Sequence, residues 1–217
     1  EVRGNSRLSV GEVRELLGAA VGENILRLDI ERLREYLAAS PWVASARVRR
    51  SLPATLEIEI HERVPLALAE LDRLYLMDGE GSLIDIYGPR TAGFDLPVVR
   101  GLNGLDADAR AGRAARAGAL LDDLGELAGE ISEVEVEDSG DLRAVLRGGG
   151  EIVRLGGPPY RPRFTTFLQL RKELVRRCPR AEYFDLRFRS RIVAVEPPVP
   201  AGETETARAG STEVVRY

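Results

Sequence analysis

Residues 43–61 read VASARVRRSLPATLEIEIH, a stretch in which two alternating runs flank a turn. Small or apolar residues alternate with serine and arginine over 43–50, and leucine and isoleucine alternate with glutamate over 56–60. Because successive side chains of a strand point to opposite faces of a sheet, this pattern predicts two strands with one buried and one exposed face. Leu52-Pro53-Ala54-Thr55 predicts the turn that joins them.

Two helices are predicted upstream of these strands. Ser9, with Glu12 three residues later, forms a capping box for the first helix, and Asp29 is the expected N-cap of the second. Residues 2–5 look like the end of a further strand. Residues 1–63 therefore spell β-α-α-β-β, with two helices covering one face of a three-stranded sheet.

The rest of the chain predicts a second domain, which begins after Val64-Pro65. Apolar runs and turn residues place its strands at 66–71, 74–77, 83–87, 131–136, 142–146 and 152–155, its helices at 105–129 and between Pro162 and Pro179, and a last strand region at 182–195. The expected fold class is α+β, with the small β-α-α-β-β domain followed by a mixed α/β domain whose sheet is mainly antiparallel.

The C-terminal end of the chain carries two further signals. Apolar side chains alternate with aspartate and arginine over 184–189, and the alternation slips at Ser190-Arg191, which predicts a bulge or bend. Residues 197–217 have no apolar period and are rich in Glu, Thr, Ala and Gly. We expect them to form a flexible tail unless a strand at Val214-Val215 pairs with the rest of the chain.

Composition and motifs argue against nucleic-acid binding and against catalysis. The chain has 217 residues and a net charge of −4, whereas nucleic-acid binders are usually basic. The single histidine, His61, lies at an exposed position of an alternating strand, and the single cysteine, Cys178, cannot form an internal disulfide or hold zinc. Phosphate-binding and nucleophile-elbow motifs are absent from the sequence. We expect no enzyme activity, no metal and no cofactor.

The sequence also bears on a membrane anchor. No apolar run approaches the roughly 20 residues that a membrane-spanning helix needs. The chain begins at Glu1 rather than at a methionine, and we expect an upstream segment that could hold an anchor or a signal.

An ordered set of short motifs runs along the chain. In the first 67 residues it comprises Val2-Arg3-Gly4-Asn5, Gly22-Glu23-Asn24-Ile25-Leu26, Pro41-Trp42-Val43, Val48-Arg49-Arg50-Ser51-Leu52-Pro53 and Glu62-Arg63-Val64-Pro65-Leu66-Ala67. It continues with Leu76-Met77-Asp78-Gly79-Glu80-Gly81, Leu96-Pro97-Val98-Val99-Arg100-Gly101 and Phe184-Asp185-Leu186-Arg187-Phe188. In this order and spacing, residues 1–196 resemble the extracytoplasmic part of the bacterial cell-division proteins of the FtsQ/DivIB family.

The resemblance implies a POTRA domain at 1–64, a β-domain at 65–196 and a tail at 197–217. It also implies a single upstream transmembrane helix in the inner membrane, with this region in the periplasm at the division septum. The family has no enzymatic activity. It is a divisome scaffold that binds FtsB and FtsL and links early and late division proteins for septal peptidoglycan synthesis. Other division proteins are expected to contact the POTRA domain.

The expected partner site is the last strand, along which FtsB adds in the family. A strand that ends a domain offers unpaired N–H and C=O groups to another chain. Phe188 would be an aromatic anchor, and Arg187 would bind a partner carboxylate. The candidate partner-binding residues are Tyr183, Asp185, Leu186, Arg187, Phe188, Arg189, Ser190 and Ile192. An ordinary amphipathic strand is the alternative for this segment.

Two other functions stay open at this point. A POTRA module of an outer-membrane protein assembly or secretion factor would share the first domain, but such proteins usually repeat it, and the second half of this chain does not repeat the first. A hydrolase with an unusual site is the alternative from another class, and an assay against cell-wall substrates would reveal it. A further hypothesis places a second partner edge at 56–61.

Overall fold

The computed structural model describes residues 1–18, 22–188, 190–197 and 212–216, the last five by their backbone. The chain divides into two compact units. The first comprises Glu1–Pro65 and Leu83–Asp85, and the second comprises Leu66–Ser82 and Ile86–Tyr217. Each unit has its own hydrophobic core.

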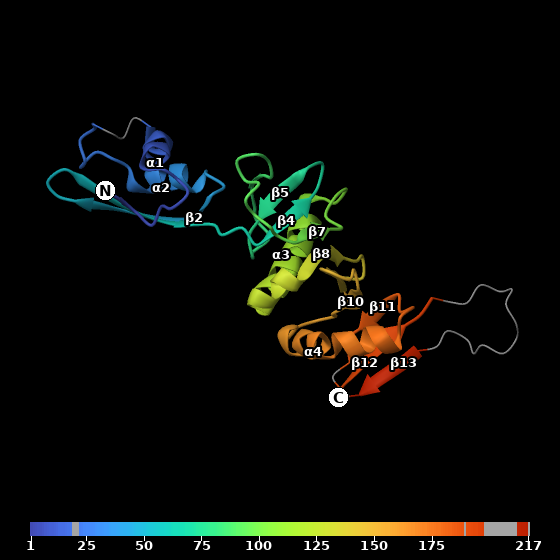
Figure 1. Cartoon of the computed structure of the whole chain (residues 1–217). Helices are drawn as coiled ribbons and strands as arrows, with labels where there is room; N and C mark the ends of the chain where they lie inside the picture. The colour runs from blue at the N-terminus through green and yellow to red at the C-terminus, as the bar shows by residue number, and fades with distance from the viewer. Residues whose placement is uncertain (19–21, 189, 198–211, 217) are drawn as a thin grey trace, which may run out of the picture. The chain divides into compact units, whose positions relative to one another are not determined.

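The first unit is a three-stranded sheet with two helices on one face (Figure 1). Its elements are β1 (Val2–Arg3), α1 (Val10–Leu17), α2 (Ile30–Ala38), β2 (Val43–Ser51) and β3 (Thr55–Glu62). β3 lies in the centre, parallel to β1 and antiparallel to β2. The predicted β-α-α-β-β order is confirmed. The hypothesis of a partner edge at 56–61 is wrong, because these residues belong to the central strand.

Local sequence explains where the two helices begin. The Ser9 hydroxyl accepts the N–H of Glu12, and the Glu12 carboxylate accepts the N–H of Ser9, so the predicted capping box is formed. Asp29 caps α2 by accepting the N–H of Arg32. The buried residues of the helices and the sheet form one core, made of Leu8, Val13, Leu17, Leu28, Leu33, Leu37, Val43, Val48, Ile58 and Ile60.

Gly4 allows the N-terminal segment to approach β3 closely. Its φ is +79°, and a Cβ at this position would lie 2.2 Å from the Ile60 carbonyl oxygen. We expect Gly4→Ala to lower the free energy of unfolding of the first unit by about 2 kcal/mol, because left-handed strain adds to the displacement of β1.

Gly22→Ala is the matched control, since Gly22 also has a positive φ (+98°) but a Cβ there would meet nothing within 4 Å. We expect about half the loss from strain alone. Urea denaturation followed by the fluorescence of Trp42, the single tryptophan, measures both variants. Equal losses would contradict the role of the close approach.

The second unit contains a mixed sheet with ten strands among the residues described, except that Leu83–Asp85 of its strand β6 are grouped with the first unit. Its strands are β4 (Ala67–Glu70), β5 (Leu74–Met77), β6 (Leu83–Ile86), β7 (Val98–Arg100), β8 (Ile131–Val136), β9 (Leu142–Leu146), β10 (Ile152–Arg154), β11 (Tyr183–Asp185), β12 (Arg191–Val195) and β13 (Thr212–Arg216). Its helices are α3 (Ala107–Leu124), the short 3₁₀ helix η2 (Gly125–Glu130) and α4 (Arg161–Arg177). The order across the sheet is β13-β12-β11-β10-β9-β8-β7-β4-β5-β6.

The α+β fold class is confirmed. The sequence pattern does not predict β7, because three residues between Pro97 and Gly101 are too few to show alternation. The helix expected at 105–129 is α3 followed by η2, and the change comes at Gly125, whose φ is +57°. A residue of this conformation ends an α-helix.

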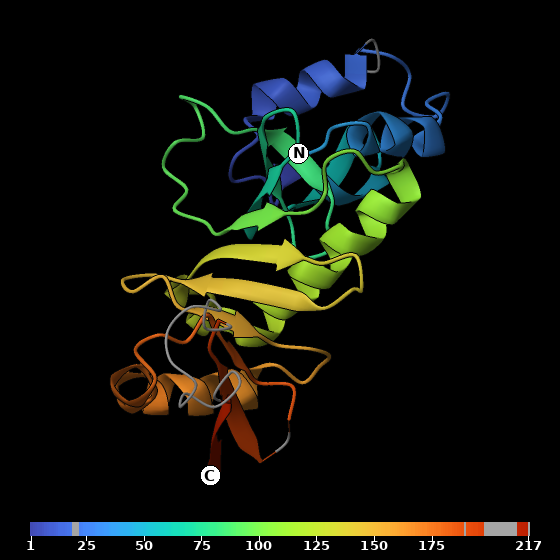
Figure 2. The ribbon, with the colours of Figure 1, turned by 90° about the vertical axis from the view of Figure 1, so that its right-hand side faces the viewer.

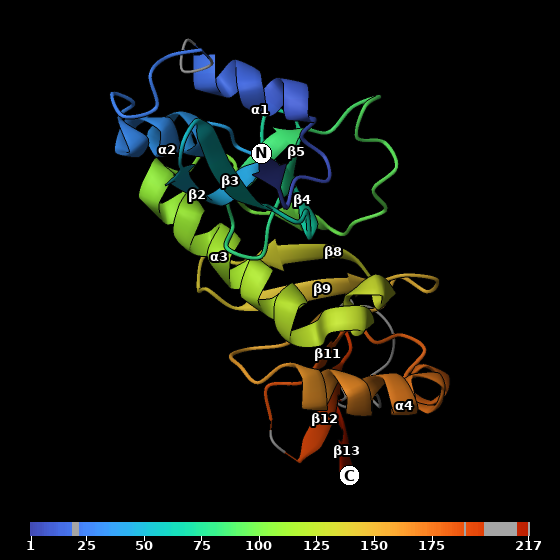
Figure 3. The same ribbon diagram turned by 90° about the vertical axis from the view of Figure 1, so that its left-hand side faces the viewer.

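Helices α3 and α4 cover one face of the sheet. Figure 3 shows both helices in front of the strands, and the opposite view in Figure 2 shows β8 and β9 in front of α3. In β9, Leu142, Ala144 and Leu146 are buried, so the alternate residues of this strand lie on the other face. Phe167 of α4 is fully buried, and its ring centroid lies 5.3 Å from that of Phe184 in β11. This pair joins α4 to the C-terminal part of the sheet.

The last predicted strand region is two strands instead of one. β11 ends at Asp185, and β12 begins at Arg191 and runs antiparallel to it. The bend expected at Ser190-Arg191 is confirmed, and it is sharper than a bulge, because the chain reverses direction between the two strands. Asp185 gives the physical reason: its carboxylate accepts the N–H of Arg187, two residues later, which is the hydrogen bond of an Asx turn.

A strand also forms within the expected tail. β13 pairs antiparallel with β12, with Val214 opposite Val193. Figure 1 shows β13, in red, beside β12. The paired strand at Val214-Val215, left open as an alternative, is thus observed. The rest of the expected tail, residues 198–211 and 217, lies outside the described residues.

Candidate partner-binding site

The predicted partner-binding residues lie on β11, on β12 and on the turn between them. β11 pairs with β10 and β12, and β12 pairs with β11 and β13. The register of β12 and β13 runs from Arg191 opposite Arg216 to Val195 opposite Thr212. The expectation that β12 is an open edge is therefore wrong, because the chain's own C-terminal segment pairs with it. In the part of the chain that is described, β13 is the last strand at this end of the sheet.

Asp185 and Arg187 form an ion pair at the end of β11. The Arg187 Nε lies 3.0 and 3.1 Å from the two carboxylate oxygens, and its Nη2 lies 2.7 Å from Oδ2. The Asp185 side chain is 6% exposed and that of Arg187 is 38% exposed. Arg187 Nη1 also donates to Asp141 at 2.9 Å. The guanidinium thus has carboxylate partners in its own chain, and a carboxylate from another protein would have to compete with them.

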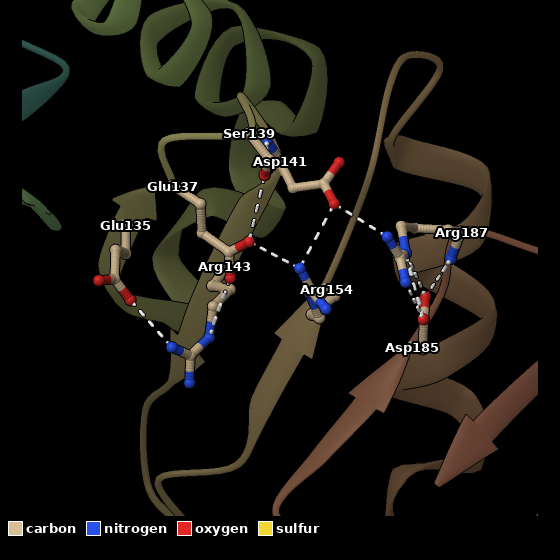
Figure 4. Close-up of polar contacts among 8 residues, drawn as sticks. All are labelled: Glu135, Glu137, Ser139, Asp141, Arg143, Arg154, Asp185 and Arg187. Carbon is tan, nitrogen blue, oxygen red and sulfur yellow. Dashed lines mark hydrogen bonds and ion pairs between the residues drawn. The ribbon is translucent and has the colours of Figure 1, made fainter. Parts of the chain in front are cut away.

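A row of charged residues extends from this pair across the sheet (Figure 4). The register sets Arg154 opposite both Asp185 and Arg143, in the two neighbouring strands. Glu137 lies between the two arginines, with its carboxylate oxygens 2.6 Å from Arg154 Nη2 and 3.8 Å from Arg143 Nε. Because the two arginines repel each other, the intervening carboxylate is needed to hold them at neighbouring positions.

The network fixes the charge of its members. Burial raises the pKa of the Asp185 carboxyl, but hydrogen bonds from Arg187 and the charge of Arg154 outweigh burial and hold this pKa below its ordinary value. The hydrogen bond to Asp185 and the neighbouring Asp141 raise the pKa of the Arg187 guanidinium, although desolvation opposes this. Both groups are therefore charged at neutral pH. A general acid or base works best with a pKa near the operating pH, so this pair is suited to fixing structure.

Phe188 and Arg191 are the accessible part of the predicted site. Phe188 is 37% exposed, and the guanidinium carbon of Arg191 lies 4.4 Å from its ring centroid, within range of a cation–π contact. Ser190 is exposed, and Arg189 lies outside the described residues. The end of the β11–β12 turn is therefore a surface that side chains of another protein can reach.

Three of the predicted residues support this surface from below. Leu186 and Ile192 are each 1% exposed and belong to the core of the second unit. Tyr183 is half-buried, and the guanidinium carbon of Arg154 lies 5.6 Å from its ring centroid. Leu186 and Ile192 can therefore meet a partner only through their backbone groups, because their side chains fill the core.

Asp141 and Arg154 belong to this site but were not predicted from the sequence. Asp141 lies in a turn signal, Ser139-Gly140-Asp141. This signal predicts that the chain reverses direction, but it does not predict the ion pair of Asp141 with Arg187. Arg154 closes a three-residue strand, which is too short to show a period. The available signal was the charge of the alternate positions, acidic in 131–137 and basic in 142–147 and at Arg154. Strands of opposite charge favour pairing with each other.

The structure also shows where the single histidine and the single cysteine lie. The side chain of His61 is 59% exposed on β3, as predicted, and Cys178 is buried. Among the described residues, no helix is long and apolar enough to cross a bilayer. The same residues include no cluster of three or more histidine, cysteine, aspartate or glutamate side chains placed to hold a metal ion.

Comparison with known families gives two matches that follow one another along the chain. The POTRA domain, FtsQ-type, matches residues 1–63. The C-terminal domain of cell division protein FtsQ/DivIB matches residues 67–187. The chain belongs to the FtsQ/DivIB family. Its members are non-catalytic division proteins, in agreement with the expectation that this chain is not an enzyme. β12 and β13 lie beyond the matched residues.

Individual FtsQ proteins align with most of the chain. Cell division protein FtsQ of Myxococcus fulvus is 32% identical over 214 residues, which cover 94% of this chain and 74% of that protein. For FtsQ of Syntrophotalea carbinolica the identity is 30% over 203 residues, covering 89% and 71%. For FtsQ of Koribacter versatilis it is 28% over 219 residues, covering 96% and 62%. The chain thus spans less than two thirds of the length of the Koribacter protein.

Proposed function

We propose that this chain is the extracytoplasmic region of a membrane-anchored divisome scaffold that binds FtsB and FtsL and links early and late division proteins for septal peptidoglycan synthesis. The supporting observation is the stacked pair of Phe188 and Arg191, which lies beside the last strands of the second sheet. Aromatic residues and arginine supply most of the binding energy in protein interfaces. Membership of the FtsQ/DivIB family supports the cell-division role.

Binding occurs by strand addition at the C-terminal end of the second sheet. An extended FtsB segment would form main-chain hydrogen bonds there and place an apolar side chain on Phe188. Asp185 and Asp141 hold Arg187 from two sides and so fix the turn that carries Phe188. A site that is already ordered loses less conformational entropy on binding, which favours affinity.

Phe188→Ala tests this site. We expect the dissociation constant for a soluble extracytoplasmic FtsB segment to rise about tenfold or more, because the anchor is lost. Isothermal titration of the segment into the whole chain measures the change. Leu52→Ala is the control, since Leu52 is 70% exposed and lies in the first unit. Unchanged affinity of a folded Phe188→Ala protein would refute the assignment of the site.

The anchor and the location are part of the same proposal. The scaffold would cross the inner membrane once, upstream of Glu1, with the described region in the periplasm and with the POTRA unit free to contact other division proteins. In the complete gene product we expect about 20 apolar residues flanked by Lys or Arg before Glu1. A polar upstream region would contradict this arrangement.

A further inference from the structure

We propose that β13 is a built-in competitor of the partner strand: it covers the β12 edge in the free protein and leaves β12 when the partner binds. This inference rests on the proposed function, since it needs a partner strand. It goes further because it names which strand receives the partner and what must move. It follows from the pairing of all five β12 residues with residues 212–216.

The direction of the backbone groups shows which residues of β12 form hydrogen bonds with β13. The carbonyl oxygen of Val195 accepts the N–H of Glu182, so the backbone groups of Val195 face β11. Backbone groups alternate in direction along a strand, and those of Ile192 and Ala194 therefore face β13. Their register partners in β13 are Val215 and Glu213. These two positions of β13 face β12, and the backbone groups of Val214 face away from the sheet.

Two features make β13 displaceable. It is five residues long, and among the described residues it pairs with a strand on one side only. A short edge strand of this kind opens at far lower free energy than a core strand. By contrast, β12 is held by core residues, because Ile192 and Ala194 are each 1% exposed. The stable half of the pair thus stays in the sheet and presents its edge when β13 leaves.

A covalently attached competitor sets a threshold for binding. Residues 196–211 connect β12 to β13, so β13 competes as part of the same chain, at an effective concentration on the order of millimolar. A free segment at micromolar concentration displaces it only by forming additional contacts. Phe188 offers one, since its ring is partly exposed and stacks on Arg191, the first residue of β12. Competition thus favours a partner with an apolar anchor over any extended peptide.

Two proline variants of the whole chain test the inference. Val215→Pro removes an N–H that faces β12, whereas Val214→Pro, the matched control, removes one that faces away from the sheet and is tolerated at an edge. We expect Val215→Pro to tighten binding of the soluble FtsB segment about tenfold, because the competing strand is lost. Val214→Pro should stay within about twofold of the wild type. Thermal unfolding establishes that both variants are folded.

Hydrogen exchange gives a readout that needs no partner. The amides of Ile192 and Ala194 should be protected in the wild type and in Val214→Pro, unprotected in Val215→Pro, and protected again when the FtsB segment is added. Equal exchange of these amides in all three free proteins would overturn the inference. So would tight binding that Val215→Pro leaves unchanged. Weaker binding by Val214→Pro would show that the partner adds outside β13, which also overturns it. If no form binds the segment, the proposed function fails along with the exchange of strands.

Discussion

Asp185→Ala is expected to lower the free energy of unfolding of the second unit by about 3 kcal/mol. The carboxylate is almost fully buried, and Arg187 and Arg154 both lie next to it. Removing one member of a buried ion pair costs about 3–5 kcal/mol when its partner is left without compensation. We take the lower end of this range because Arg187 keeps its ion pair with Asp141, and because its side chain is 38% exposed and is partly screened by water.

The control for this variant is Asp138→Ala. The Asp138 carboxylate also binds an arginine, Arg113 Nη2, at 2.8 Å, but its side chain is 99% exposed. Such a surface pair contributes little, so the variant should unfold like the wild type. Because the chain has two units, the measurement has to report on the second one, and hydrogen exchange of peptides from β10, β11 and β12 does so. Equal effects of the two substitutions would show that burial of Asp185 is not what matters.

The same site predicts a pH dependence, which Asp185→Asn tests without leaving a cavity. The pKa of Asp185 is lower in the folded chain than in the unfolded one, where an aspartate titrates near pH 4. The stability that Asp185 contributes is therefore fully present above the unfolded pKa and is lost as the pH falls toward the folded pKa. The difference in stability between the wild type and Asp185→Asn should be constant above about pH 5 and shrink below about pH 4. A difference that grows on acidification would contradict the lowered pKa.

The two units differ in how far their sequences predict them. In the first, the alternation over 43–60 and the caps at Ser9 and Asp29 predict every element except exact bounds, because each signal is local. In the second, residues 184–189 alternate like one continuous strand, yet the strand ends at Asp185. The turn has no glycine or proline to mark it, and the Asx hydrogen bond to Arg187 ends the strand instead. Local polarity fits both conformations, so alternation cannot choose between them.

The candidate site was also predictable only in part, because local sequence patterns show some of its features and not others. Phe188 could be selected as an anchor because it is an aromatic residue in a polar segment, and it is exposed. Leu186 and Ile192 are also apolar, but which face of the strand is covered depends on how α4 packs against the sheet, and this burial cannot be read from 182–195 alone. The Asp141–Arg187 ion pair joins residues 46 positions apart. Such contacts follow from strand order, which no local pattern encodes.

The second large expected effect concerns the core residues that support the site. Phe167→Ala should destabilise the second unit by about 3–5 kcal/mol, through lost apolar burial and a cavity under β11. Phe167 is fully buried, and its ring packs at 5.3 Å and a tilt of 52° against Phe184, the residue before Asp185. Phe188→Ala is the control, since its ring is partly exposed and should cost less than about 1 kcal/mol of stability.

The variants Phe167→Ala and Phe188→Ala separate the stability of the β11–β12 hairpin from partner binding by it. Phe184 anchors β11 from the helix side of the sheet, and Phe188 lies on the surface four residues later. If the core sets the position of the site, Phe167→Ala weakens FtsB binding only because the hairpin is open in a fraction of the molecules. Lower temperature or added osmolyte should close the hairpin and restore the affinity. Phe188→Ala removes the contact itself, so the same conditions should leave its affinity low. Restored binding by both variants would mean that Phe188 acts through folding, and the anchor would then have to be sought elsewhere on this edge.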